Sequence, residues 1–237
     1  GGAAEYLPAD VLLAGYVSMR EPGQLFQEFS ALMSTQQPTF QSDLAELEQK
    51  LGAGFVGNLT AAMGTEVAFG IHGLSVSGPA WTIVALANET AVIENSLAKL
   101  VETVNAELPA DQQDKRVVLA QEDVAGRTWK TLRAGGVPFG VTWTYDGGYL
   151  VAASDRGTAE RAIATRASGS QLVFSTAFQN QLPASAGIHP SAFAWLNTRG
   201  ALDMVSTFFP NPALSGLPPF LTRHGGLRGR FGRVGGA

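Results

Sequence analysis

The 237-residue chain has no cysteine and few charged residues, and both shortages narrow its chemistry. Without cysteine it can form no disulfide, thiolate nucleophile, iron–sulfur cluster or cysteine-ligated zinc site. Charged residues make up 15% of the chain, well below the quarter or so that is typical of globular domains. The 16 basic and 20 acidic residues give a net charge of −4, which is unlike the basic surface of a nucleic-acid binder. We therefore expect no nucleic-acid partner.

Long apolar runs are also missing. No window approaches the roughly 18 consecutive apolar residues of a membrane-spanning helix, so the sequence predicts no membrane span. Hydrophobic residues nevertheless reach 45%, a normal level for a chain that buries a core. The chain opens with Gly1-Gly2 instead of Met, which fits either the remnant of a tag or the start of a processed protein.

The motifs that carry catalytic chemistry are incomplete. Ser96-Leu-Ala-Lys99 matches the S-x-x-K pattern of penicillin-binding enzymes, but that pattern acts together with S-D-N and K-T-G motifs, and the chain contains neither. The three histidines, His72, His189 and His224, have no second ligand at metal-binding spacing. We predict no catalytic residue, no metal site and no cofactor.

Hydrophobic periodicity predicts an α+β fold with a mainly antiparallel sheet and amphipathic helices packed on one face of it. Four successive apolar runs, joined by Gly, Pro and Asp turns, indicate an antiparallel meander between residues 116 and 154. Strands are predicted over 7–19, 65–74, 81–87, 116–124, 127–134, 139–146, 148–154 and 191–198. Helices are predicted over 21–34, 43–51, 55–63, 89–108, 154–168, 175–182 and 199–209.

The most informative stretch is residues 142–163, which read TWTYDGGYLVAASDRGTAERAI. Asp146-Gly147-Gly148 predicts a tight hairpin in which both glycines take positive φ angles. Ser154 or Asp155 is then expected to cap the following helix. A helix N-terminus attracts anions, but the Asp155 carboxylate would repel one here. We interpret the stretch as a structural hairpin and cap.

Aromatic residues are concentrated in the predicted meander. Such side chains could line a cavity for an apolar ligand between helices and sheet, and they equally suit an ordinary core. The candidates for this lining are Trp129, Phe139, Trp143, Tyr145 and Tyr149.

A short internal echo suggests how the chain is divided. Tyr16-Val-Ser-Met-Arg20, followed by Gly23, is similar to Trp195-Leu-Asn-Thr-Arg199, followed by Gly200. Both segments are predicted to form a strand and then a helix, and either a repeat or chance explains the match. We assign an α+β domain to 1–187, a strand–helix unit that would begin a truncated repeat to 188–222, and a Gly/Arg-rich tail to 223–237.

The tail is a candidate contact for a protein partner or for a second copy of the chain. A segment so rich in glycine has little apolar surface with which to build a core of its own, so docking on a neighbouring subunit is one hypothesis and packing on its own domain is the other. The residues proposed to make the contact are Arg223, Arg228, Arg230 and Arg233.

Three stretches carry a resemblance to a known family. They are Leu7-Pro-Ala-Asp10, Met63–Phe69 with Gly78–Val84 and the helix from Asn88 to Asn105, and Asp146–Ser154 running into Phe174–Phe178. Together they resemble a family of exported bacterial proteins, domain of unknown function thirty-three fifty-two, over roughly residues 7–209. The resemblance implies an extracytoplasmic protein, periplasmic or at the cell surface and often anchored by an upstream segment, and it supplies no catalytic residues.

These observations favour a non-enzymatic, extracytoplasmic binding or assembly module, as a subunit of a larger complex or as a homo-oligomer. The alternative is a carrier of a lipid or another apolar ligand, held between helices and sheet. A hydrolase with an unusual site is a third hypothesis, which no residue of the sequence specifically supports.

Overall fold

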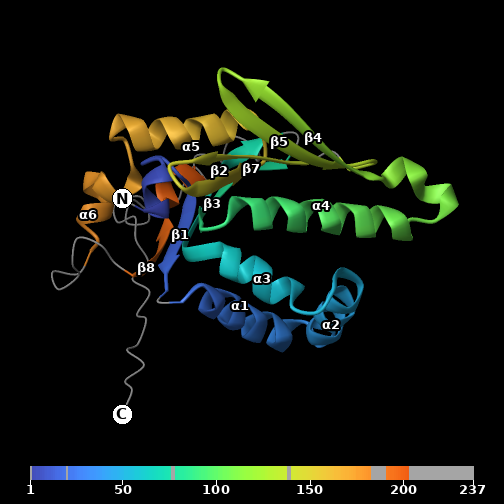
Figure 1. Cartoon of the computed structure of the whole chain (residues 1–237). Helices are drawn as coiled ribbons and strands as arrows, with labels where there is room; N and C mark the ends of the chain where they lie inside the picture. The colour runs from blue at the N-terminus through green and yellow to red at the C-terminus, as the bar shows by residue number, and fades with distance from the viewer. Residues whose placement is uncertain (1, 20, 76–77, 138–139, 183–190, 203–237) are drawn as a thin grey trace, which may run out of the picture.

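The computed structural model describes residues 2–19, 21–75, 78–137, 140–182 and 191–202, which build one eight-stranded sheet flanked by helices (Figure 1). Every strand pair is antiparallel, and the strand order is β4-β5-β6-β7-β3-β2-β1-β8. The predicted α+β fold with an antiparallel sheet is therefore confirmed. The strands are β1 (Leu13–Ser18), β2 (Met63–Ser75), β3 (Gly78–Ala87), β4 (Val117–Val124), β5 (Arg127–Ala134), β6 (Gly140–Asp146), β7 (Tyr149–Ala153) and β8 (Ala192–Leu196).

The named α-helices come in three places along the chain, between β1 and β2, between β3 and β4, and between β7 and β8, and a short 3-10 helix precedes β1. Residues 198–202, directly after β8, are also helical. No helix of the described residues is long and apolar enough to cross a membrane. The α-helices are α1 (Pro22–Gln36), α2 (Phe40–Leu51), α3 (Phe55–Ala62), α4 (Thr90–Glu107), α5 (Arg156–Ser168) and α6 (Thr176–Gln179), and the 3-10 helices are η1 (Ala3–Tyr6), η2 (Ala110–Lys115) and η3 (Leu172–Phe174).

The meander from β4 to β7 forms as the sequence predicts. Its last turn has φ angles of 55° at Gly147 and 87° at Gly148, the left-handed backbone that a tight hairpin demands and that glycine adopts without strain. After β7, the carboxylate of Asp155 accepts a hydrogen bond from the backbone N–H of Thr158 at 2.9 Å. The hairpin and the helix cap are thus both confirmed.

The helices cover both faces of the sheet, and the prediction of a single covered face is wrong. Val151 of β7 lies in one core cluster with Ala159 and Ala162 of α5. On the opposite face Trp143 and Tyr145 of β6 donate hydrogen bonds to a side chain of α4, and Figure 1 shows α5 and α4 on opposite sides of the strands. Both faces of β6 are buried at residues 142–144, so this strand lacks the simple alternation that marks one covered face.

The N-terminal segment belongs to the core. Tyr6, Leu7 and Val11 are fully buried between α5 and the sheet, and the backbone N–H of Leu172 donates to the carbonyl of Leu7 at 2.7 Å. The strand that the sequence predicts from residue 7 therefore begins only at Leu13, because the residues before it pack between α5 and the sheet and do not extend the strand.

The predicted strand–helix unit at 188–222 shares this sheet. Its strand β8 pairs with β1, from Leu13 opposite Leu196 to Val17 opposite Ala192. Most of the remaining unit and the whole tail at 223–237 lie outside the described residues.

Candidate functional site

The predicted aromatic lining is divided between the two faces of the sheet. Trp143 and Tyr145 face α4, whereas Trp129 and Tyr149 belong to the core cluster beneath α5. Phe139 lies outside the described residues. The two described pairs therefore line different spaces.

Glu94 of α4 organises the first pair. Trp143 Nε1 donates to its Oε1 at 3.0 Å, and the Tyr145 hydroxyl donates to the same oxygen at 2.7 Å. The Lys130 ammonium donates to Oε2 at 2.5 Å. Burial raises the pKa of Glu94, but these three hydrogen bonds outweigh burial and hold the pKa below its usual value. A carboxylate with three donors fastens α4 to the meander.

Tyr145 remains protonated in this arrangement. Its burial, together with the hydrogen bond to the negatively charged Glu94, raises the pKa of the phenol far above its usual value. A hollow of about 210 Å³ lies beside the network, below the roughly 300 Å³ at which small-molecule pockets begin. Its lining residues are Gln121, Thr128, Lys130, Trp143, Thr144 and Tyr145.

A second polar cluster secures the N-terminal segment on the other face. The Tyr6 hydroxyl lies 2.9 Å from Asp146 Oδ2 and accepts from Arg166 Nη1 at 2.6 Å, while Arg127 pairs with Asp146 at 2.9 Å. The Arg166 guanidinium also lies over the Tyr6 and Tyr149 rings, 5.0 and 5.5 Å from their centroids. Burial, and next the hydrogen bond to Asp146, raise the pKa of Tyr6 far above its usual value, so its phenol stays neutral and serves as a structural donor.

His72 is the one described histidine. Its Nε2 lies 2.8 Å from Thr82 Oγ1, and its Nδ1 has no hydrogen-bond partner in the described part of the chain. Burial, and secondarily the charge of Arg161, lower its pKa to about 4, so the ring is neutral near pH 7. The described residues contain no cluster of His, Asp or Glu that could hold a metal ion.

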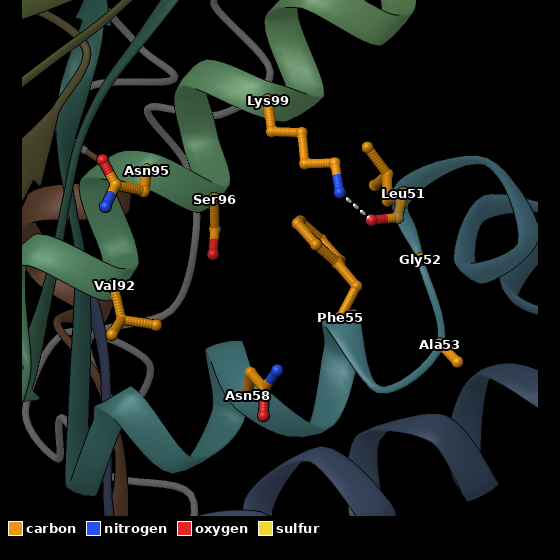
Figure 2. A pocket seen from close by; sticks show the side chains of 9 residues that line it. All are labelled: Leu51, Gly52, Ala53, Phe55, Asn58, Val92, Asn95, Ser96 and Lys99. Carbon is orange, nitrogen blue, oxygen red and sulfur yellow. Dashed lines mark hydrogen bonds between the residues drawn. The ribbon is translucent and has the colours of Figure 1, made fainter.

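A cavity of about 370 Å³ lies between α3, α4 and the turn that joins α2 to α3 (Figure 2). Its lining combines apolar side chains with amides, one hydroxyl and one ammonium group. The residues are Leu51, Gly52, Ala53, Phe55, Asn58, Val92, Asn95, Ser96 and Lys99.

The Ser96 and Lys99 side chains of the S-x-x-K match both line this cavity, yet they form no catalytic pair. The Lys99 ammonium donates to the carbonyl of Leu51, as the dashed line in Figure 2 shows. Leu51 ends α2, so this cation satisfies a terminal carbonyl at the negative end of the helix dipole. No carboxylate or histidine lines the cavity, and the ammonium of Lys99, the lysine of the pattern, is bonded to the Leu51 carbonyl.

The turn in this cavity carries a glycine pattern that is similar to a nucleotide-binding motif. Gly52-Ala-Gly54-Phe-Val-Gly57 has the spacing G-x-G-x-x-G, which in dinucleotide-binding folds follows a strand and opens the helix of a βαβ unit. Here the stretch follows helix α2 and opens the eight-residue helix α3, with Gly54 at φ 78° as the N-cap. The structural context of a dinucleotide site is therefore absent.

The sheet also exposes an apolar surface on the side of α4. Phe69 and Ile83 are cross-strand partners, and they remain 42% and 43% exposed. Leu196 of β8, on the same face, is 38% exposed. The Phe69 ring lies over Gly15, where a Cβ atom would be only 2.2 Å from Phe69 Cε1. We call Phe69, Ile83 and Leu196 the open sheet patch.

The strand β8 forms the edge of the sheet beside this patch. Phe193 and Trp195 turn inward and contact Phe178 of α6, whereas Ala192, Ala194 and Leu196 are exposed on the outer face. The strand reads AFAWL and has no charged residue. Charged side chains commonly block unwanted strand pairing at sheet edges, and the edge strand β8 has none of them.

The remaining predicted site residues, Arg223, Arg228, Arg230 and Arg233, lie outside the described residues. Comparisons of the chain with protein-family models, with curated proteins and with solved structures found no match. The resemblance to the exported bacterial family thus stays a prediction.

Proposed function

We propose that this protein is a binding or assembly module that acts outside the cytoplasm and performs no catalysis of its own. The observation that carries the proposal is the open sheet patch of Phe69, Ile83 and Leu196 beside the uncharged edge strand β8. Large apolar side chains that stay exposed on one face of a sheet are a signal of an interaction site.

The energetics favour a partner over an exposed patch. Full burial of a Leu, Ile or Phe side chain contributes about 1.5–3 kcal/mol. Since the three patch residues keep 38–43% of their surface exposed, a partner that covers them would gain roughly 1 kcal/mol from each. With only 15% charged residues in the chain, the cost of desolvating charges at such a contact is small.

The ionisable side chains of the interior support a role without catalysis. The Glu94 carboxylate is occupied by three donors, and Tyr6 is held between Arg166 and Asp146. Each group fastens one structural layer to another, which leaves none of them poised as a general acid or base. The extracytoplasmic location is supported by the family resemblance alone.

Site-specific photo-crosslinking in the cells that produce the protein tests the proposal. A benzophenone amino acid at Ile83 is expected to yield a discrete adduct with a protein. The matched control is Val118, which is 59% exposed on the opposite edge strand β4 and is expected to yield none. No protein adduct at Ile83, or equal adducts at both positions, would overturn the proposal.

A carrier of an apolar ligand is the second candidate, and the cavity of about 370 Å³ favours it. This volume lies in the range of small-molecule pockets, and Leu51, Phe55 and Val92 supply apolar walls. Organic extraction and mass spectrometry of the protein purified without detergent would show a stoichiometric lipid or apolar metabolite. A Val92→Trp variant would lose this ligand, whereas Val118→Trp would keep it; an extract without ligand removes this candidate.

A further inference from the structure

The internal echo and the sheet register point independently to the same symmetry. Aligning Tyr16 with Trp195 places Gly15 on Ala194. The structure pairs Gly15 with Ala194 at the centre of the β1–β8 ladder, which runs from Leu13 opposite Leu196 to Val17 opposite Ala192. Each residue of this ladder is therefore related to its echo by one local two-fold axis, which passes between Gly15 and Ala194.

The two strands differ in what their outer edges bind. β1 is paired on both sides, with β8 and with β2, whereas β8 ends the sheet and pairs with β1 alone among the described strands. By the local symmetry, the outer edge of β8 corresponds to the edge of β1 that β2 occupies.

The pattern of hydrogen bonds between β1 and β8 shows which backbone groups of β8 are directed outward and are available to pair with another strand. The N–H of Ser18 donates to the carbonyl of Ser191, and the N–H of Asn197 donates to the carbonyl of Leu12. Because hydrogen-bonded and non-hydrogen-bonded pairs alternate along an antiparallel ladder, Gly15 and Ala194 form a non-hydrogen-bonded pair. The backbone N–H and C=O of Ala194 consequently point away from β1, as do those of the other two exposed residues of β8, Ala192 and Leu196.

The side chain of Trp195 is a second observation that supports a missing neighbour at this edge. It is 8% exposed, and its Nε1 has no hydrogen-bond partner among the described residues. In the echo its counterpart is Tyr16, whose pKa is raised by burial and then by the nearby carboxylate of Glu66 on β2. A strand that stood to β8 as β2 stands to β1 would bring an acceptor at the position of Glu66 toward Trp195.

We propose that the outer edge of β8 is an acceptor site for one extended strand of a partner protein. The strand pairs antiparallel and has the pattern of β2, with small residues and one acidic residue on the inner face and β-branched or aromatic residues on the outer face. This proposal rests on the proposed function and specifies its mode of binding as strand addition, in which main-chain hydrogen bonds give affinity and alternate side chains give specificity.

The probe for this site is a fluorescein-labelled peptide of residues 65–73, TEVAFGIHG, taken from β2. The full chain is expected to bind it saturably in a polarisation assay, and a peptide of the same composition in scrambled order is expected to bind at least tenfold more weakly. In amide NMR spectra the bound peptide should protect the N–H groups of Ala192, Ala194 and Leu196 from solvent exchange. No binding, or binding without this protection, would overturn the proposal.

A proline scan of the two sheet edges supplies the matched variants. Ala194→Pro removes an outward N–H and leaves the bonds between β8 and β1 in place, and proline is tolerated at edge strands. Gln121→Pro does the same on β4, where the pairing of Gly135 N–H with the carbonyl of Arg116 sets the phase. Ala194→Pro is expected to weaken peptide binding at least tenfold and Gln121→Pro to leave it unchanged; equal effects would refute the site.

The two proposals fail separately. Ile83 adducts together with no binding of the peptide would reject the strand-acceptor site and leave the binding module standing. Loss of both signals would reject both.

Discussion

Replacing Glu94 tests whether the link between α4 and the meander stabilises the fold. Glu94→Ala removes the acceptor of three hydrogen bonds, from Lys130, Trp143 and Tyr145. The Trp143 side chain is buried, with 3% exposure, so water cannot readily replace the lost partner. The Lys130 side chain is 23% exposed and can turn its ammonium group toward solvent.

The expected cost follows from these exposures. A buried donor that loses its acceptor costs about 1–3 kcal/mol, and an accessible ion pair contributes up to about 1 kcal/mol. Because two such donors, Trp143 and Tyr145, lose their acceptor, Glu94→Ala should lower the free energy of unfolding by about 2–7 kcal/mol, a large share of the 5–15 kcal/mol or so of a typical domain. Glu94→Gln keeps a carbonyl oxygen for Trp143 and Tyr145 and should cost only about 1–2 kcal/mol.

The pH dependence of the wild type adds a second signature. The folded-state pKa of Glu94 is lowered, so its contribution is fully present above the unfolded-state pKa of about 4.3 and is lost as the pH falls through the folded-state value. The difference between wild type and Glu94→Gln should shrink accordingly in acid. Urea unfolding followed by tryptophan fluorescence measures both effects.

Glu102→Ala is the control, because Glu102 is exposed on the same helix. It should change the free energy of unfolding by no more than about 0.5 kcal/mol. Equal losses for Glu94→Ala and Glu102→Ala, at unchanged urea m-values, would refute the assignment of a stabilising role to the network.

Four further substitutions test other parts of the fold. Gly148→Ala places a side chain at φ 87° and should lower stability by about 1–2 kcal/mol. Gly57→Ala, in helix α3 with open space around it, should raise stability by up to about 1 kcal/mol. Thermal unfolding measures both changes, and stability changes of the same sign would contradict the turn geometry. His72 is neutral in the folded protein near pH 7 because its pKa is lowered to about 4. Its contribution to the free energy of unfolding should be fully present above its unfolded-state pKa of about 6.5 and be lost as the pH falls toward 4. Urea unfolding at a series of pH values should show a weaker pH dependence for His72→Gln than for the wild type. Lys99→Met removes the bond to the last carbonyl of α2 and should cost about 1 kcal/mol, seen as faster hydrogen exchange in α2 but not in α5.

The features of this fold that could be predicted from the sequence are those that depend on residues close together in the chain. The Gly147-Gly148 hairpin and the Asp155 cap depend on a few adjacent positions, and both form as predicted. The strand β2 could also be predicted, because its side chains alternate between two faces. Its pairing with β3 places Ala68 opposite Val84 on one face and Phe69 opposite Ile83 on the other.

Which face of a strand is covered depends on partners far away in the chain, and the sequence does not indicate it. The small residue Ala68 is fully buried while Phe69 remains 42% exposed, because small side chains on β2 admit the N-terminal segment close to the sheet. The same limit applies to Glu94, whose partner Tyr145 lies 51 positions along the chain. Helical periodicity predicted α4 but gave no sign that its carboxylate would meet the aromatic residues of β6.

The burial of the N-terminal segment has a consequence for how the protein is made. Tyr6 is fully buried, and it bonds to Arg166, which lies 160 positions later in the chain. At translation rates of about 5–20 residues per second, the interval between the two is on the order of 10–30 s. During that time Tyr6, Leu7 and Val11 leave the ribosome without the helix that will cover them. The buried environment of this segment can therefore form only after α5 has been synthesised.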